Sequence, residues 1–343
     1  MIKIDLLLLN AFDFGGIERA SNTLFQAFKS FDINCELISV REKKNKKSFE
    51  YIEDPTVLQY GKTDFMKLFF YAKNIDKNVV VISTYDRISI MLSLCFFLLK
   101  KKNKIIAHQH ADYYAHSKKI RCLRFLFYRR IDFICALTQQ DVKYYLEWHE
   151  NVYLIPNILQ LSHEYKYIPI KERDTDLIAI GRLDPVKRFD DYIKISSLLI
   201  EEDIISSSIL IGDGPEFNKL KKLDRHNIIK GRNDNIYTLL QNAKILLVTS
   251  YRESFSMVIL EAMSQGTIVI SYNCPTGPGE LIQDGVNGFL VENGNVNAML
   301  DKCRFIFENI DKFDDISKAA ILTSKLYSSQ IIIDKWKNLI YEC

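Results

Sequence analysis

A chain of 343 residues is long for one domain, and its 48% apolar residues are enough for two ordinary cores. A formal net charge of +3 gives no support for a nucleic-acid partner, and the apolar run over residues 88–99 is too short to span a bilayer. Its seven cysteines fit no metal-binding spacing and no signal peptide precedes the first strand, so the sequence predicts free thiols and a cytoplasmic location.

The first half alternates strand and helix patterns. An apolar strand within residues 1–10 leads to Gly15 and Gly16, and a helical pattern follows over 17–31. Paired glycines let a ligand approach the backbone closely, although they also suit a tight turn. The dinucleotide fingerprint is incomplete, which argues against a nicotinamide cofactor. Further strands are predicted at residues 35–40, 79–84, 104–108, 133–137 and 152–155.

After a polar linker over residues 158–175, the second half restarts the alternation and ends in a helix over 331–341. Its strands are predicted at residues 176–180, 208–211, 227–229, 244–248, 267–271 and 288–291. Alternating strands and helices predict two Rossmann-like α/β domains. We place them at 1–165 and 166–325, with a terminal segment at 326–343.

The stretch from Thr249 to Gly266 combines a strand end, a polar turn and a helix that starts near Ser256. Ser254 and Ser256 are suitable N-caps, and the helix N-terminus is a place for phosphate. Glu253 and Glu261 would lie roughly 10–12 Å apart at most, about the span from the sugar to the ribose of a nucleotide sugar. Alternatively, both glutamates are surface residues favoured by the helix dipole.

These motifs together resemble the retaining nucleotide-sugar glycosyltransferases of family four, the glycosyl transferases group 1, of the bacterial surface-polysaccharide type. The resemblance is carried, in the order of that family, by residues 15–19 (GGIER), 155–157 (IPN), 181–187 (GRLDPVK), 211–215 (IGDGP), 253–266 and 284–291 (DGVNGFLV). It implies the GT-B fold, in which two Rossmann-like domains face each other across a deep cleft. The terminal helix of such enzymes crosses back to the N-terminal, acceptor-binding domain.

The resemblance assigns roles to several matching residues. Arg182 and Lys187 would contact the donor diphosphate and stabilise its departure without a metal, although they could be ordinary surface charges. Glu253 would hold the donor sugar and Glu261 the ribose. Many family members have Gly where Ser254 follows the first glutamate, so sugar specificity does not transfer.

Other matches are looser. Phe255, Ser256 and Met257 would offer backbone N–H groups to phosphate or sugar, and the turn before Arg232 would lie near the base. His110 would contact the donor sugar, or be a satisfied loop histidine. A metal site made of His108, His110, Asp112 and His116 has poor spacing, and the family usually needs no divalent metal there. The turn 274–280 resembles a variant of bacterial polysaccharide enzymes, or is simply structural.

Basic residues gather in the first half, most densely over residues 118–130 (KKIRCLRFLFYRR). This stretch has helical spacing, and its apolar face could be core or could rest on an anionic membrane surface.

The sequence therefore predicts a retaining hexosyltransferase. Its expected donor is a nucleotide sugar of the UDP-sugar class, and its expected acceptor is a hydroxyl of a glycan or polyprenyl-linked glycan in capsule or O-antigen synthesis. It would need no cofactor and would act in the cytoplasm or on the inner face of the plasma membrane. The alternatives are an epimerase-like enzyme of the same fold and an inactive homologue that serves as a partner subunit.

Overall fold

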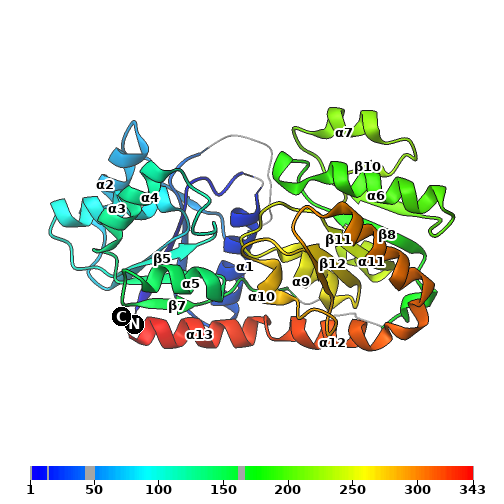
Figure 1. Ribbon diagram of the computed structural model, residues 1–343. Helices are drawn as coiled ribbons and strands as arrows, with labels where there is room; N and C mark the ends of the chain where they lie inside the picture. Colours follow the sequence, from blue (N-terminus) through cyan, green and yellow to red (C-terminus); the bar gives the residue numbers. More distant parts are fainter. Residues whose placement is uncertain (1, 14, 43–50, 161–166, 343) are drawn as a thin grey trace. The chain divides into compact units, whose positions relative to one another are not determined.

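The computed structural model describes residues 2–13, 15–42, 51–160 and 167–342. The chain divides into two compact units, the first formed by Met1–Gln160 with Ser329–Cys343 and the second by Leu161–Ser328. Each unit is built on its own parallel sheet with helices packed against it (Figure 1). The predicted α/β fold class is therefore confirmed.

In the described part of the first unit, a seven-stranded sheet has the order β3-β2-β1-β4-β5-β6-β7, and all neighbouring strands are parallel. The strands are β1 (Lys3–Leu8), β2 (Cys35–Ser39), β3 (Thr56–Val57), β4 (Val79–Ser83), β5 (Ile105–Gln109), β6 (Phe133–Ala136) and β7 (Val152–Leu154). The helices are α1 (Gly16–Ser30), α2 (Asp64–Asn74), α3 (Asp86–Leu98), α4 (Lys118–Tyr128), α5 (Gln139–Leu146) and α13 (Ser329–Tyr341).

Two apolar clusters pack on opposite faces of this sheet, because side chains alternate along each strand. Ile4 and Leu6 of β1 belong to the cluster on one face, which includes residues of α1 and α13. Leu7, the next residue along the strand, belongs to the cluster on the opposite face, beneath α2 and α3. Trp336 of α13 is fully buried in the first cluster, edge-on to Phe28 with ring centroids 5.7 Å apart. The last helix is thus part of the first unit.

In the described part of the second unit, a six-stranded parallel sheet has the order β10-β9-β8-β11-β12-β13. The strands are β8 (Thr175–Ile180), β9 (Ser208–Ile211), β10 (Ile229–Gly231), β11 (Ala243–Val248), β12 (Ile268–Tyr272) and β13 (Phe289–Val291). The order reverses between β8 and β11, and ligands bind at the carboxyl ends of such a strand pair. The helices are η1 (Ile170–Glu172), η2 (Pro185–Lys187), α6 (Phe189–Glu201), α7 (Phe217–Leu223), α8 (Ile236–Gln241), α9 (Met257–Ser264), α10 (Pro278–Leu281), α11 (Val296–Glu308), η3 (Ile310–Lys312) and α12 (Asp314–Lys325).

Every predicted strand is present, with small shifts at the ends. The two-residue edge strand β3 was not predicted, because two residues carry no periodic signal. The predicted loop over 158–175 is confirmed over the described residues 158–160 and is wrong toward its other end, where Ile170–Glu172 form η1 and Thr175 begins β8. Ile158 lies in the core of the first unit, and Ile170 of η1 lies in the core of the second. Residues 161–166 of that stretch lie outside the described residues.

Candidate functional site

The loops after β8 and β11 are joined by hydrogen bonds at the carboxyl edge of the second sheet. The Thr249 hydroxyl donates to the carbonyl oxygen of Lys187 at 2.8 Å, and the Tyr251 N–H donates to that of Val186 at 2.8 Å. Since β8 and β11 are neighbours at the reversal of strand order, their loops leave the sheet side by side. This fixes the short helix η2 against the turn that carries Glu253.

Lys187 and Glu253, both predicted site residues, meet in an ion pair. The distance between Lys187 Nζ and Glu253 Oε1 is 2.6 Å, and the Ser250 hydroxyl donates to the same oxygen at 2.6 Å. The side chain of Glu253 is only 10% exposed. The alternative that Glu253 is a surface residue is therefore wrong.

The start of α9 departs from an ordinary helix cap. Ser256 occupies the N-cap position but has a left-handed backbone, with φ 66° and ψ 76°, and makes no capping hydrogen bond through its side chain. The prediction that Ser256 caps the helix in the usual way was therefore wrong, because capping needs an extended backbone. Its buried hydroxyl has no hydrogen-bond partner among the described residues.

This strained helix start can hold an anion. The first N–H groups of a helix have no intrahelical acceptor, and they carry partial positive charge. Strained non-glycine residues of this kind cluster at ligand sites. Ser256 thus adds a hydroxyl donor to an anion-binding helix end, three residues after Glu253.

The other predicted residues of α9 and its turn differ in exposure. Met257 begins the helix and is half-buried. Phe255 is buried edge-on to Tyr327, with ring centroids 5.6 Å apart, so its side chain belongs to the core and only its backbone remains for a ligand. Glu261 is 1% exposed, which excludes the surface alternative for this glutamate as well.

Two glycines allow the loops after β8 and β9 to pack closely. A Cβ atom on Gly212 would lie 1.9 Å from the carbonyl oxygen of Gly181, and one on Gly214 would lie 2.5 Å from that of Leu183. Arg182 lies between Gly181 and Leu183 in this tight arrangement, and its side chain is exposed. The glycines thus fix the loop that presents Arg182.

Sequence reasoning missed how the turn 274–280 acts on Glu253. The Thr276 hydroxyl donates to the carbonyl oxygen of Glu253 at 2.6 Å. Gly277 has φ +89°, and a Cβ atom there would lie 2.9 Å from the Cβ atom of Glu253. The Cys274 thiol donates to the carbonyl oxygen of Ser250 at 2.9 Å, and burial, followed by the charge of Glu253, raises its pKa to about 12. The turn is therefore a support for Glu253, which its Pro and Gly content alone could not reveal.

Arg232 lies apart from this group. It follows β10, the edge strand, is exposed, and pairs with Asp234 at 3.3 Å. Its predicted position near the base stays a prediction.

In the first unit, Gly15 and Gly16 stand at the start of α1, beyond the carboxyl end of β1. A Cβ atom on Gly15 would lie 2.3 Å from Glu18 Oε2, whereas one on Gly16 would meet open space. Glu18 is buried and accepts a hydrogen bond from the Tyr85 hydroxyl, and burial together with Glu18 raises the pKa of Tyr85. Sequence reasoning gave Glu18 and Tyr85 no role.

His110 directly follows β5 and is 8% exposed. Its ring centroid lies 4.2 Å from that of His108, and its Nε2 atom has no hydrogen-bond partner among the described residues. The alternative of a fully satisfied loop histidine is therefore wrong. Burial, followed by the charge of His108, holds the pKa of His110 well below 6.5, so its imidazole is neutral at physiological pH.

The metal alternative for this region finds no geometric support. His116 Nε2 lies 3.1 Å from Asp86 Oδ2 rather than beside His108 and His110. Within the described ranges, no three His, Cys, Asp or Glu side chains converge as metal ligands would.

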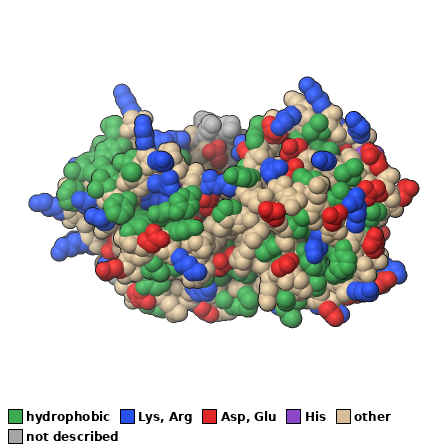
Figure 2. All heavy atoms as spheres, in the orientation of Figure 1, with side chains coloured by type: hydrophobic (Ala, Val, Ile, Leu, Met, Phe, Trp, Pro, Cys, Tyr) green, Lys and Arg blue, Asp and Glu red, His purple; other side chains and the backbone are tan. Residues whose placement is uncertain are grey.

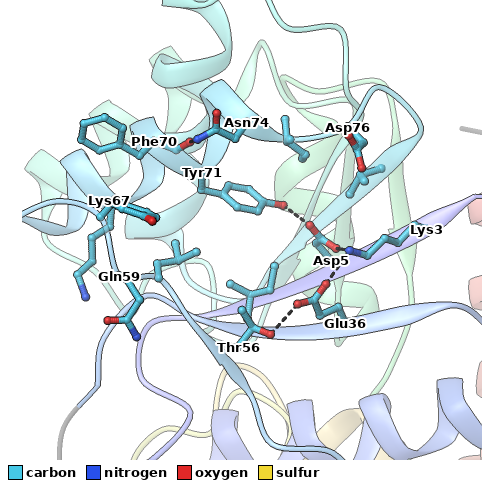
Figure 3. Close-up of a pocket in the computed structure, with 15 residues that line it drawn as sticks. Lys3, Asp5, Glu36, Thr56, Gln59, Lys67, Phe70, Tyr71, Asn74 and Asp76 are labelled. Atoms are coloured by element: carbon cyan, nitrogen blue, oxygen red, sulfur yellow. Dashed lines mark hydrogen bonds and ion pairs between the residues drawn. The ribbon is translucent and has the colours of Figure 1, made fainter.

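A cavity of about 310 Å³ lies in the first unit, near the amino ends of β1 and β2 and so away from Gly15 and His110. Figure 3 shows the residues that line it. Several of its charged groups pair with one another, although Asp5 Oδ1 accepts no hydrogen bond from the described residues. Lys3 bonds Glu36 at 2.6 Å and lies 3.5 Å from Asp5, which also accepts a hydrogen bond from the Tyr71 hydroxyl at 2.7 Å. Burial raises the pKa of Asp5. The cavity is therefore not a part of the candidate site.

Comparison with known proteins places this arrangement in a family. Residues 164–323 match the family described as "Glycosyl transferases group 1". This range includes Arg182, Lys187, Glu253 and Glu261. The resemblance predicted from the sequence is thus confirmed.

Relatives and solved structures extend the similarity along the whole chain. The amylovoran biosynthesis glycosyltransferase AmsD of Erwinia amylovora is 23% identical over 99% of this chain and 100% of its own. A Campylobacter jejuni α-1,4-N-acetyl-D-galactosaminyltransferase, named for a GalNAc-containing diNAcBac-PP-undecaprenol acceptor, is 26% identical over 100% and 99%. The structure of Anabaena HepE in complex with UDP-glucose covers 100% of both chains with a TM-score of 0.81 and 17% identity. The GT-B fold class is confirmed by such neighbours.

Proposed function

The second unit of this chain belongs to the glycosyl transferases group 1 family, and on this basis we propose that the protein moves a sugar from a UDP-sugar to a hydroxyl group, with retention of anomeric configuration. The acceptor is a glycan or lipid-linked glycan of a cell-surface polysaccharide. Relatives named for amylovoran synthesis and for an undecaprenol-linked acceptor support this setting. The solved complex of Anabaena HepE with UDP-glucose supports the donor class.

The observation that carries the proposal is the start of α9 beside the Lys187–Glu253 ion pair. The hydroxyl of Ser256, which finds no hydrogen-bond partner in the part of the chain that the structure describes, suits the diphosphate of the donor, as do the first N–H groups of α9. Arg182 and Lys187 add two cations from the neighbouring loop. The departing nucleoside diphosphate gains negative charge, and fixed cations and N–H dipoles stabilise that charge in the transition state.

Glu253 contacts the sugar rather than the diphosphate in this proposal. Its carboxylate accepts hydrogen bonds from sugar hydroxyls and stabilises positive charge that develops at the anomeric carbon. Its ion pair with Lys187, 2.6 Å away, offsets its negative charge next to the departing phosphate. Glu261 holds the ribose hydroxyls. Its burial shields these hydrogen bonds from water, which strengthens them. The contact of His110 with the donor sugar stays a prediction.

The proposed chemistry assigns no step to a metal ion. Incoming hydroxyl and leaving diphosphate lie on the same face of the sugar, so the leaving phosphate oxygen takes the proton of the attacking hydroxyl. One C–O bond breaks and one forms, and the products are the glycoside and UDP.

A thermal-shift screen of the protein in EDTA against UDP, GDP, ADP and several UDP-sugars tests this proposal. A ligand that binds only the native state raises the unfolding midpoint by mass action, and about 100 Kd of ligand adds roughly 2.7 kcal/mol. We expect UDP and one UDP-sugar to raise it and ADP to leave it unchanged. A midpoint unchanged by every nucleotide would overturn the proposed donor site, and a shift only with GDP would overturn the choice of base.

A further inference from the structure

Helix α4 buries a charged side chain and exposes several apolar side chains. Arg124 and Tyr128 are buried, whereas Leu123 is 45% exposed and Leu126 is 53% exposed. An ordinary amphipathic surface helix does the reverse. The sequence prediction that the apolar face could be core is therefore wrong for these leucines.

A polar network holds the helix in this orientation. Arg124 Nη1 lies 3.3 Å from Asp86 Oδ2 and donates to the Tyr145 hydroxyl at 2.9 Å, while its Nη2 donates to the Tyr113 carbonyl oxygen at 2.6 Å. The Tyr128 hydroxyl donates to the other oxygen of Asp86. Buried and interconnected contacts of this kind fix the helix rotation. The outward leucines are thus presented by a rigid element.

These leucines belong to a larger apolar area, which we call the α3–α4 surface: Phe97, Leu98, Leu123, Phe125 and Leu126, all at least 41% exposed. The Ser93 hydroxyl of α3 donates to the Phe127 carbonyl oxygen of α4 at 2.8 Å, so the two helices are adjacent. Figure 2 shows hydrophobic side chains together with Lys and Arg on the side of the first unit that carries α2, α3 and α4. Contiguous exposed apolar areas mark interaction sites, whereas single exposed residues do not.

Basic side chains border this surface. Residues 100–130 contain ten Lys and Arg and a single acidic residue, Asp112, which is buried. Of these basic residues, Arg124 is buried and Lys104 pairs with Asp132 at 2.9 Å. The Arg130 guanidinium lies 4.5 Å from the Phe97 ring centroid, and that of Arg129 lies 4.4 Å from the Phe125 ring centroid. Aromatic and aliphatic side chains surrounded by such cations match the acyl and headgroup layers of an anionic bilayer.

We propose that the α3–α4 surface docks the protein on an anionic lipid bilayer. A second copy of the chain is a poorer occupant, because a two-fold contact would place two equally basic surfaces against each other. Among the described residues no helix is long and apolar enough to cross a membrane, so this surface would lie on the bilayer. The proposal does not depend on the proposed function, since it rests on residues outside the donor site.

Vesicle co-sedimentation tests the proposal directly, with vesicles of phosphatidylcholine alone and with about one third phosphatidylglycerol. We expect binding to the anionic vesicles and binding at least about tenfold weaker to the neutral ones, since each basic residue near an anionic surface strengthens binding about fivefold. Leu123→Gln with Leu126→Gln should weaken binding about tenfold or more by removing apolar burial. Lys118→Gln with Lys119→Gln should weaken it by a similar factor, and added salt should do the same.

The matched control is Leu322→Gln with Leu326→Gln. These leucines lie in and just after α12 of the second unit, are four residues apart, and are 63% and 60% exposed. We expect this pair to leave vesicle binding unchanged. All variants should keep the wild-type unfolding midpoint and UDP response, which separates loss of docking from loss of folding or of the donor site.

Three results would overturn the proposal. The first is a wild-type protein that does not bind anionic vesicles, and the second is an equal loss of binding in the α12 control. The third is a wild-type dimer in analytical ultracentrifugation that the Leu123 and Leu126 substitutions dissociate, which would assign the surface to a second copy.

Discussion

Helices α9 and α4 each bury one charged side chain, Glu261 in α9 and Arg124 in α4, and both side chains are 1% exposed. The two helices differ in what packs them against their unit. α9 is apolar along most of its length and is buried in the second unit from Ile259 to Ser264, so the N–H groups at its start are the backbone groups left for a ligand. α4 is held by the ion pair and hydroxyl contacts of Arg124 and leaves leucines in water. Helix orientation therefore depends on where partners for buried charge lie, as well as on the apolar pattern. In α9 the result is a helix start that we propose as an anion site, and in α4 it is an exposed apolar face.

The largest expected effect comes from removing the anchor of α4. Arg124→Ala removes the buried guanidinium partner of Asp86 and leaves His116 Nε2, 3.1 Å from Asp86 Oδ2, as its basic neighbour. Breaking a buried pair costs about 3–5 kcal/mol. Urea unfolding should show this loss in the transition of the first unit. Arg129→Ala, at the exposed end of the same helix, should change stability by less than about 0.5 kcal/mol. Equal losses in the two variants would mean that the network does not hold α4.

The corresponding change beside α9 should affect chemistry more than stability. Glu253→Gln keeps the shape and the acceptor oxygen for Ser250 but removes the negative charge. We expect sugar transfer to fall about 100- to 1,000-fold, the range for losing one preorganised electrostatic contact. Glu308→Gln, exposed at the end of α11, is the control. Wild-type turnover in Glu253→Gln would refute the assigned role, and a protein that supports polysaccharide synthesis without turnover would be a partner subunit.

The buried histidines of the first unit predict a pH dependence of stability. Burial lowers the pKa of His108 to about 4, whereas in the unfolded chain it is near 6.5. Below pH 6.5 the unfolded state therefore binds more protons than the native state. The free energy of unfolding is highest above pH 6.5 and should fall by about 3 kcal/mol as the pH drops to about 4. His108→Asn should make the fall shallower, as measured by urea unfolding at several pH values. His226→Asn, at an exposed histidine of the second unit, is the matched control.

The turn that supports Glu253 should give the smallest effect. Gly277→Ala adds a Cβ atom 2.9 Å from that of Glu253 at a positive φ, so it should cost about 1–3 kcal/mol and displace the carboxylate. We expect transfer to fall about tenfold through this displacement. Gly285→Ala also has a positive φ, +73°, but its Cβ atom would meet open space. Equal activity in the two variants would show that the turn does not position Glu253.

The sequence was a good guide wherever the signal was local. Continuous apolar runs such as Val79–Ser83 gave the central strands, and the glycine and charge pattern of residues 181–187 located the loop of Arg182 and Lys187. The pairing of Lys187 with Glu253 could not be predicted, because it depends on two loops 66 residues apart that meet at one sheet edge.

The orientation of α4 and the conformation of Ser256 escaped prediction for related reasons. The partners of Arg124 come from α3, α5 and the loop before α4, so no window along the chain contains them. Serine is a common N-cap in extended geometry, so its left-handed backbone here could not be predicted from the residue type.

Titration of UDP into the protein by calorimetry, in EDTA, is the most direct test of the donor site at the start of α9. Arg182→Ala and Lys187→Ala should each weaken binding about tenfold or more, because charge-assisted contacts to phosphate are the strong ones. Arg225→Ala, at an exposed arginine elsewhere in the second unit, should bind UDP as the wild type does. Unchanged affinity in Arg182→Ala and Lys187→Ala, or equal losses in all three variants, would contradict the assignment of this helix start and its two cations to the diphosphate.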